Sequence, residues 1–315
     1  MSAKIDVTAL ESPWAKHGRP SWRIEHCIVC GSGDFAPVFP RGLCWVYECR
    51  ECGLQFVEPQ PSDAELAEIY DADYFRTFGF SERDGAYREL KQAWAQRMLD
   101  LAERHFSIGR HLDVGSALGD LVFAARERGW GTIGVEPNAF AVRECERLAP
   151  GCVVEGPFED YRPEDGPFDL ITCNDVLEHL RRPDAALRKF CRLLRPSGGL
   201  ILTTIDVRSL LARVLRQRWV HYHRDHLWYF SQPVLRRLAQ DAGLEVIACG
   251  RARKLYHLNY ILEILARNTN FPLLARASRL GRKRLPDSLL RTMFPLHEGL
   301  LLVARASGGS RAKQR

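Results

Sequence analysis

Short apolar runs alternate with amphipathic segments along most of this chain. Five runs, at residues 111–114, 132–135, 152–154, 168–173 and 200–205, are short and mainly apolar, which is typical of strands buried on both faces of a sheet. Most segments between them carry apolar residues three or four positions apart, as helices with one buried face do. This alternation predicts an α/β fold with a doubly wound, mostly parallel sheet.

The chain after these runs is organised differently. Residues 207–218 predict a basic helix, and 244–249 and 299–306 predict two final strands. Between those strands lies a long segment, 254–298, with helical periodicity and many leucines and arginines. A connection of this length needs structure of its own or a functional role, so we predict a helical insertion there.

The pattern divides the chain into five parts. We predict an N-terminal arm at 1–26, a cysteine-rich ribbon at 27–60, a linker and aromatic segment at 61–84, an α/β domain at 85–306, and a basic tail at 307–315. The α/β domain opens with a long amphipathic helix that leads into its first strand.

The first strand–helix–strand unit carries a glycine turn. Gly115 ends the first strand, Gly119 follows four residues later, and Glu136 ends the second strand. Ligands of open α/β sheets bind at such carboxyl ends, where an acid can accept hydrogen bonds from a ribose diol. Ala117 stands where a dinucleotide fingerprint has the glycine that admits a pyrophosphate. A nucleoside ligand without phosphates, S-adenosylmethionine (SAM), therefore fits better than a dinucleotide, and a turn without ligand is the third possibility.

Two C-x-x-C-G knuckles precede the α/β domain. They contain Cys27, Cys30, Cys49 and Cys52, and Cys44 lacks a partner at knuckle spacing. Four thiolates at this spacing predict a tetrahedral zinc site without an open position. Such a site stabilises a module that is too small to bury a hydrophobic core of its own. A nucleic-acid-binding ribbon is the alternative, disfavoured because the knuckles carry few basic residues.

Composition adds little to this picture. The chain has 315 residues, 46% hydrophobic and 27% charged, with a net charge of +6. That charge suits an anionic partner or reflects an arginine-rich proteome. We find neither an apolar run of the roughly 20 residues of a membrane helix nor an apolar signal core at the N-terminus, so we expect a cytoplasmic protein.

Several motifs together resemble one family. They are the two knuckles, YDADYF, LDVGSALGD, GVEPN, FDLITCNDVLEHL, LRPSGGLILTT and HLWYFS. The chain resembles the class I SAM-dependent methyltransferases, in the branch with an N-terminal four-cysteine zinc ribbon. Members of that branch often lie in bacterial gene clusters for polysaccharide, lipid or natural-product sugars. The resemblance covers roughly 27–306.

The resemblance implies a seven-stranded Rossmann-like sheet with an antiparallel last strand, and SAM and Zn²⁺ as cofactors. The residues that it places around SAM are Asp113, Gly115 and Gly119 beside the methionine portion, Glu136 at the ribose hydroxyls, Asn174 facing the cofactor, and Phe158 with Glu159 near the adenine. The chain departs from the family pattern at Ala117, where a glycine is usual, and at Ser116, where cysteine is frequent.

The reaction class sets the remaining candidates. Methyl transfer from a sulfonium is an in-line displacement, so the protein mainly positions the acceptor and excludes water. A hydroxyl acceptor also benefits from a general base, which predicts catalytic roles for His179, His223 and His226. Each has a structural alternative, orienting a loop or satisfying a buried backbone group. The aromatic run 228–230 is predicted to be core.

These observations predict a methyltransferase acting on a small or lipid-linked metabolite, most plausibly a sugar or glycan hydroxyl. The alternatives are C-methylation of a nucleotide-linked deoxysugar and a catalytically silent SAM-binding protein. The apolar and basic residues of 254–298 suit peripheral contact with an anionic bilayer, or a lid or dimer surface. A nucleic-acid partner is not expected, and the oligomeric state is not predicted.

Overall fold

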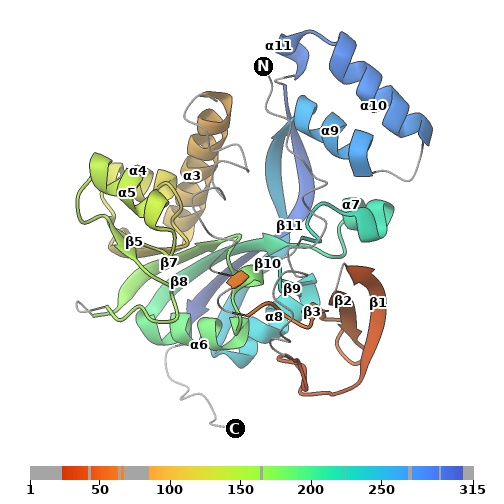
Figure 1. Ribbon diagram of the computed structural model, residues 1–315. Coiled ribbons are helices and arrows are strands. Elements are labelled where there is room, and N and C mark those ends of the chain that lie inside the picture. Colours follow the sequence, from red (N-terminus) through yellow and green to blue (C-terminus); the bar gives the residue numbers. More distant parts are fainter. Residues whose placement is uncertain are drawn as a thin grey trace.

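The computed structural model describes residues 23–41, 44–62, 65–66, 85–163, 166–223, 225–268, 272–290 and 292–307 (Figure 1). Most of the predicted linker and aromatic segment at 61–84, nearly all of the predicted arm and nearly all of the predicted tail lie outside the described residues.

A seven-stranded sheet forms the centre of the molecule, in the order β10-β11-β8-β7-β4-β5-β6. Its parallel members β4 to β8 are Arg110–Val114, Gly131–Glu136, Val153–Glu155, Phe168–Asn174 and Leu194–Ile205. β11 (Met293–Ala306) pairs antiparallel with both β8 and β10 (Leu244–His257). The predicted doubly wound, seven-stranded sheet with an antiparallel last strand is confirmed.

Helices cover both faces of this sheet (Figure 1). On one face, α3 (Gly85–His105) and α4 (Asp120–Glu127) pack over Leu170 and Ile201. On the other face, α6 (Pro183–Leu193) and α8 (Gln232–Asp241) pack over Ile171 and Leu200. Neighbouring residues of one strand thus serve opposite cores, as the pleat requires. A fifth helix, α5 (Ala139–Leu148), begins after Asn138, whose side chain accepts the amide hydrogens of Phe140 and Ala141.

The insertion is shorter than the sequence predicted. Its helices are α9 (Leu258–Asn268), α10 (Pro272–Arg284) and α11 (Asp287–Leu290), because residues 250–257 and 293–298 continue β10 and β11. β11 pairs with β8 only as far as Gly299, so the outer part is a two-stranded arm. Residues 250–257 are mainly polar and 293–298 contain Pro295, so neither segment has the apolar pattern of a buried central strand. The basic helix predicted at 207–218 is likewise only α7 (Leu210–Leu215) followed by a 3₁₀ turn.

The cysteine-rich ribbon is a second, antiparallel sheet. Its strands β1 (Phe35–Arg41), β2 (Cys44–Cys49) and β3 (Gln55–Glu58) are joined by β9 (Trp228–Tyr229), which comes from the α/β domain. Phe56 lies opposite Trp228, and the Val57 amide donates to the Leu227 carbonyl at 3.0 Å. Trp228 and Tyr229 are fully buried, so their prediction as core residues is confirmed.

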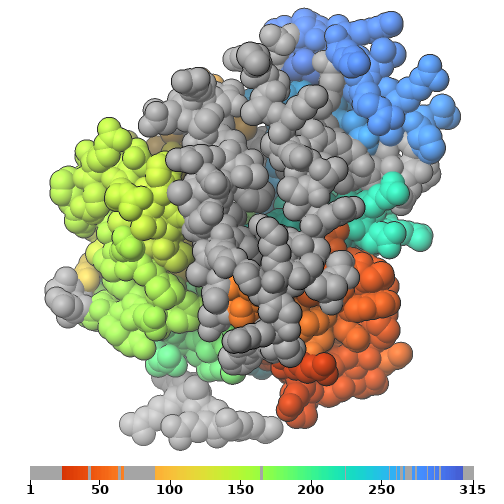
Figure 2. Space-filling view, viewed as in Figure 1, coloured from red at the N-terminus to blue at the C-terminus, as the bar shows by residue number. Residues whose placement is uncertain are grey.

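The two sheets share their cores. Leu54 and Phe56 of the ribbon belong to the same hydrophobic cluster as Leu112 and Phe190 of the α/β domain. A smaller cluster joins ribbon residue Val46 to residues beyond β8, such as Trp219. Figure 2 shows the ribbon, in red and orange, and the insertion, in blue, on the same side of the molecule, with α7 in teal between them.

Because Trp228 is fully buried, its contribution to the free energy of unfolding can be measured. Trp228→Ala is expected to lower the free energy of unfolding by about 3–5 kcal/mol, because it opens a cavity between the two sheets. The matched control is Trp45→Ala, since Trp45 of β2 is 42% exposed, and this change should cost less than about 1 kcal/mol. Urea unfolding of both variants measures the difference, and equal losses would contradict a shared core.

Candidate active site

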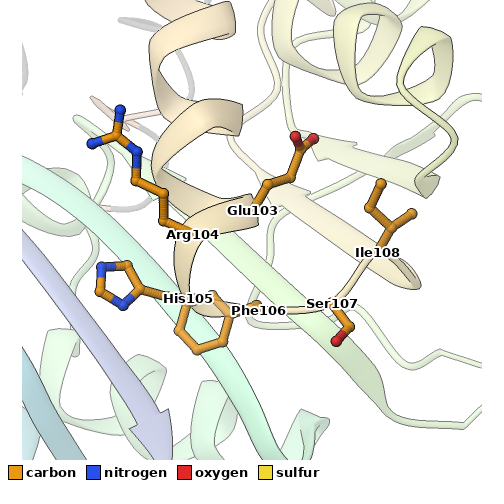
Figure 3. A pocket seen from close by; sticks show the side chains of 6 residues that line it. All are labelled: Glu103, Arg104, His105, Phe106, Ser107 and Ile108. Atoms are coloured by element: carbon orange, nitrogen blue, oxygen red, sulfur yellow. The ribbon is translucent and has the colours of Figure 1, made fainter.

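The candidate site lies at the carboxyl ends of the parallel strands. The loops after β4, β5, β7 and β8 meet there, as ligand-binding loops of open α/β sheets do. A surface pocket at the end of α3, lined by residues 103–108, lies at the opposite edge, because this turn leads into the start of β4 (Figure 3). It is therefore separate from the loops described below.

The glycine loop after β4 requires glycine at two positions. Gly115 has φ +72°, and a Cβ there would lie 2.3 Å from Cγ2 of Val176. Gly119 has φ +80°, and a Cβ there would lie 2.8 Å from the ring of Phe123. The loop therefore brings its backbone close to the turn after β7, and only glycine allows this approach.

Glu136 ties the glycine loop to the end of β5. Its two carboxylate oxygens accept the amide hydrogens of Ala117 and Asn138, each at 2.9 Å. Ala117 has φ +49°, in the left-handed region that favours glycine, and the Glu136 bond holds it there. Burial raises the pKa of Glu136, while these two amide hydrogen bonds oppose the rise. Each oxygen retains a second lone pair for a ligand hydroxyl.

Asp113 ends a buried hydrogen-bond chain that runs across three strands. The Thr172 hydroxyl donates to Asp113 Oδ1 at 2.6 Å, and His111 Nε2 lies 2.8 Å from the same hydroxyl. On its other side, His111 Nδ1 is 3.1 Å from the Thr132 hydroxyl. Burial lowers the pKa of His111 to about 3, so the ring is neutral, and burial raises the pKa of Asp113 to about 7. A cationic ligand group beside Asp113 would favour its ionised form.

Asn174 ends β7 with an unsatisfied donor. Its Oδ1 accepts from the Thr203 hydroxyl at 3.4 Å, but its Nδ2 is buried without a hydrogen-bond partner among the described residues. The next residue, Asp175, has φ +54° and is held by Lys254 Nζ at 2.7 Å. Burial acts to lower the pKa of Lys254, but Asp175 raises it above its usual value. This ion pair joins the β10–β11 arm to the site.

Phe158 lies in the loop after β6 and is 3% exposed. Its ring centroid is 4.8 Å from that of Phe190, and Lys189 Nζ lies 4.3 Å from its centre. Lys189 also donates to the carbonyl oxygens of Phe158 and Tyr161. The loop predicted near an adenine is thus fixed onto α6.

The three predicted histidines come together beside Asp225. His223 Nδ1 is hydrogen-bonded to Asp225 Oδ1, and His179 Nδ1 lies 2.9 Å from the Asp225 carbonyl oxygen. His226 contacts both rings, with centroids at 3.8 Å from His223 and 4.6 Å from His179. His221, which the sequence analysis did not select, completes this histidine cluster, and its ring stacks on His226 at 5.9 Å.

Burial and charge act in the same direction on His226 but in opposite directions on Asp225. Burial lowers the pKa of His226 well below its ordinary value, and the neighbouring imidazoles lower it further. Burial acts to raise the pKa of Asp225, but the charge and hydrogen bond of His223 hold it well below its usual range. His226 is therefore a weak base, and the Asp225 carboxylate is placed to orient the His223 imidazole.

The four predicted zinc ligands meet in the ribbon. The sulfurs of Cys27 and Cys52 are 3.5 Å apart, those of Cys30 and Cys49 are 3.4 Å apart, and all four lie within 4.8 Å of one another. Sulfurs around a tetrahedral zinc ion are separated by about 3.8 Å, because the Zn–S distance is about 2.3 Å. This arrangement suits a structural zinc ion.

Comparisons with known proteins agree with this geometry. The sequence profile of a family described as "Methyltransferase domain" matches residues 86–248. The chain is 26% identical over 178 residues to a ubiquinone biosynthesis O-methyltransferase of Chromobacterium violaceum, covering 52% of this chain and 76% of that protein. A Pseudomonas aeruginosa protein of the same name is 29% identical over 184 residues, covering 52% and 77%.

A solved structure shares the fold. The SAM-dependent methyltransferase of Archaeoglobus fulgidus is 19% identical, with a TM-score of 0.52, and the match covers 74% of this chain and all of that one. The chain belongs to the methyltransferase domain family and is a class I SAM-dependent methyltransferase.

The described residues fit SAM. A glycine-lined backbone turn, a buried carboxylate at the end of β5 and the buried Nδ2 of Asn174 all lie at one edge of the sheet. The acid suits a ribose diol, and the turn has no second glycine for a pyrophosphate. Asp113, Gly115, Gly119, Glu136 and Asn174 would hold the cofactor, and the role of Phe158 remains a prediction.

Sequence reasoning missed several residues of this edge. Lys254 was assigned to the insertion, and His221 was passed over although it stands two residues from His223. His111 and Thr172 were taken simply as strand residues. The polar character of His111, Asp113 and Thr172 within otherwise apolar strands was the available signal, because buried polar groups require partners.

Glu136 provides a direct test of the cofactor site. Glu136→Gln should weaken SAM binding about tenfold, because an NH2 group that cannot accept a hydrogen bond replaces one carboxylate oxygen. Isothermal titration calorimetry measures this change. Glu155→Gln is the matched control, since Glu155 lies opposite Glu136 on β6 and is exposed. Unchanged affinity in Glu136→Gln would contradict a ribose contact.

Proposed function

We propose that this methyltransferase transfers the methyl group of SAM to a hydroxyl oxygen of a sugar or glycan, as a small or a lipid-linked metabolite. The observation that carries the oxygen acceptor is the pair of imidazoles bonded to Asp225 at the carboxyl edge of the sheet. Carbon acceptors are the alternative, and the name O-methyltransferase carried by the bacterial relatives favours oxygen.

SAM, when bound, would supply a methyl group on a sulfonium: the acceptor oxygen would bond to the methyl carbon as the carbon–sulfur bond breaks, with S-adenosylhomocysteine as the leaving group. The chain's own residues have two tasks. The glycine loop and Glu136 orient the donor. The proton that the hydroxyl loses goes to His223, which is bonded to the Asp225 carboxylate, or to His179, which is bonded to the Asp225 carbonyl oxygen. Asp225 stabilises the imidazolium that results, because its carboxylate is 3% exposed and held by His223.

The insertion supports a lipid-linked acceptor and peripheral membrane contact. Leu273 is 82% exposed, Leu280 is 46% exposed, and Arg276, Arg279 and Arg284 on the same helix α10 are also exposed. Exposed apolar side chains flanked by arginines suit the surface of an anionic bilayer. Within the described part of the chain, no helix combines the length and apolar character that crossing a bilayer would need.

Transfer of a labelled methyl group can identify the chemical class of the acceptor. Methyl-labelled SAM and the full chain, added to an extract of source cells, should label the polysaccharide or lipid fraction, and Glu136→Ala should remove that label. Label in soluble sugars would narrow the acceptor to a free metabolite. Label in protein or nucleic acid, or stable bonds from carbon to the methyl group, would contradict the proposal.

The ribbon is proposed to hold one structural zinc ion. Its four thiols meet in the ribbon, whose sheet continues into β9. The ion would therefore stabilise the segment that carries the histidine cluster. The thiols of Cys27 and Cys52 already share a hydrogen bond, and this lowers the pKa of Cys27 to about 5.

Removing this metal should destabilise the whole chain. At free zinc a hundredfold above the dissociation constant, binding adds about 2.7 kcal/mol to the free energy of unfolding, and chelation should remove it. Cys52→Ser should abolish the effect, whereas Cys191→Ser, a half-buried thiol outside the ribbon, should preserve it. Thermal unfolding with and without chelator measures both. A chelator-insensitive wild type would contradict a ribbon zinc.

A further inference from the structure

The histidine cluster has more nitrogen ligands than a proton relay needs. His221, His223 and His226 stand within six residues of one another, and their ligating atoms lie within 4.8 Å of each other. We propose that these three histidines bind a divalent transition-metal ion, separate from the zinc of the ribbon, at the acceptor side of the site.

Hydrogen bonds to one nitrogen of His223 and of His226 fix these two rings, as they do in many metal-binding histidines. His223 is bonded through Nδ1 to Asp225 Oδ1, and His226 Nδ1 lies 2.8 Å from the His221 carbonyl oxygen. With Nδ1 engaged, Nε2 is the nitrogen that an ion would take from each ring. Metal-ligating histidines usually donate their other ring nitrogen to a carboxylate or a backbone carbonyl, which fixes the tautomer and the ring.

Buried carboxylates beside the cluster call for a cation. Glu178, Asp225 and Glu298 are each at most 3% exposed, and one oxygen of each has no hydrogen-bond partner among the described residues. Glu298 Oε1 lies 3.5 Å from His221 Nε2, and that nitrogen is itself buried without a hydrogen-bond partner there. Lys254 is bonded to Asp175. Lys254 also acts electrostatically on Glu178 and Glu298, and a metal ion would add a second positive charge beside these carboxylates.

Imidazole ligands select the kind of ion. Nitrogen donors suit zinc, cobalt, nickel and iron, whereas magnesium and calcium require oxygen ligands. Three histidines leave a coordination position open, in contrast to the four thiolates of the ribbon. Metal–nitrogen bonds are about 2.0–2.1 Å long, so binding would draw the three nitrogens closer together than 4.8 Å.

The position of the cluster suggests that its metal ion takes part in methyl transfer, and this inference rests on the proposed function. The cluster follows β8 and contacts the turn after β7, at the same edge as the cofactor loop. An acceptor hydroxyl on the open position would lose its proton more readily, because a bound cation lowers its pKa. His179 lies outside the three ligands, contacts His226 and would receive that proton.

Cobalt titration of the full, untagged chain tests the site without any turnover. After chelation, the wild type should bind two Co²⁺ ions. The ribbon ion should show intense thiolate-to-cobalt charge-transfer absorption, and the second ion should show only weak visible bands, because its ligands are nitrogen and oxygen. One Co²⁺ per chain, with the thiolate spectrum alone, would overturn the proposal.

Variants assign the second ion. The double variant His221→Gln, His223→Gln should bind one Co²⁺ with an unchanged charge-transfer band, whereas His105→Gln, an exposed histidine at the end of α3, should bind two. Retention of the second ion by the double variant would overturn the assignment. Retained SAM binding by calorimetry shows that the variant is folded.

Activity then separates this proposal from the function proposed above. Methyl transfer into the labelled fraction should fall at least about tenfold in the double variant or on removal of the second ion, and zinc should restore the wild type alone. If two ions bind but no fraction is labelled, the metal site stands and the proposed function fails. If transfer proceeds at full rate with the ribbon ion alone, the metal site has no role in the reaction.

Discussion

The structure depends on the short pairing between β3 of the ribbon and β9 of the α/β domain. Two residue pairs, Gln55 with Tyr229 and Phe56 with Trp228, extend the ribbon sheet into the larger domain. Trp228 also donates from Nε1 to the Leu180 carbonyl at 2.9 Å, so one buried side chain joins the ribbon, the histidine segment and the turn after β7. A zinc ion in the ribbon would thereby stabilise the acceptor side of the site, although every zinc ligand lies before residue 53.

The cofactor side is held by a different constraint. Glu136 accepts two amide hydrogen bonds and fixes a loop in which Ala117 adopts a conformation that favours glycine. The donor and acceptor sides thus have separate supports that meet at one edge of the sheet. Asp175 and Lys254 connect this edge to the β10–β11 arm. This separation explains how one fold can keep its donor loop constant while the acceptor side varies.

The sequence predicted the sheet and the glycine turn after β4 well, because both depend on local patterns. Buried strands are apolar, glycine turns are short, and the acid follows its strand directly, so Gly115, Gly119 and Glu136 could be selected from neighbouring residues alone. Contacts between distant segments left no such pattern. β9 has two residues, Pro295 interrupts the second strand of the arm, and His221 lies beside Glu298, which is 77 positions away in the chain (298 − 221).

The two-stranded arm of β10 and β11 has a consequence for the diversity of such enzymes. Before Gly299, residues 293–298 of β11 pair with β10 and not with β8. The helices α9 to α11 connect the outer ends of these two strands. Replacing those helices therefore breaks no hydrogen bond of the central sheet. A lineage can exchange this tip as a unit, while Lys254 and Glu298 at the root of the arm keep their contacts with Asp175 and His221.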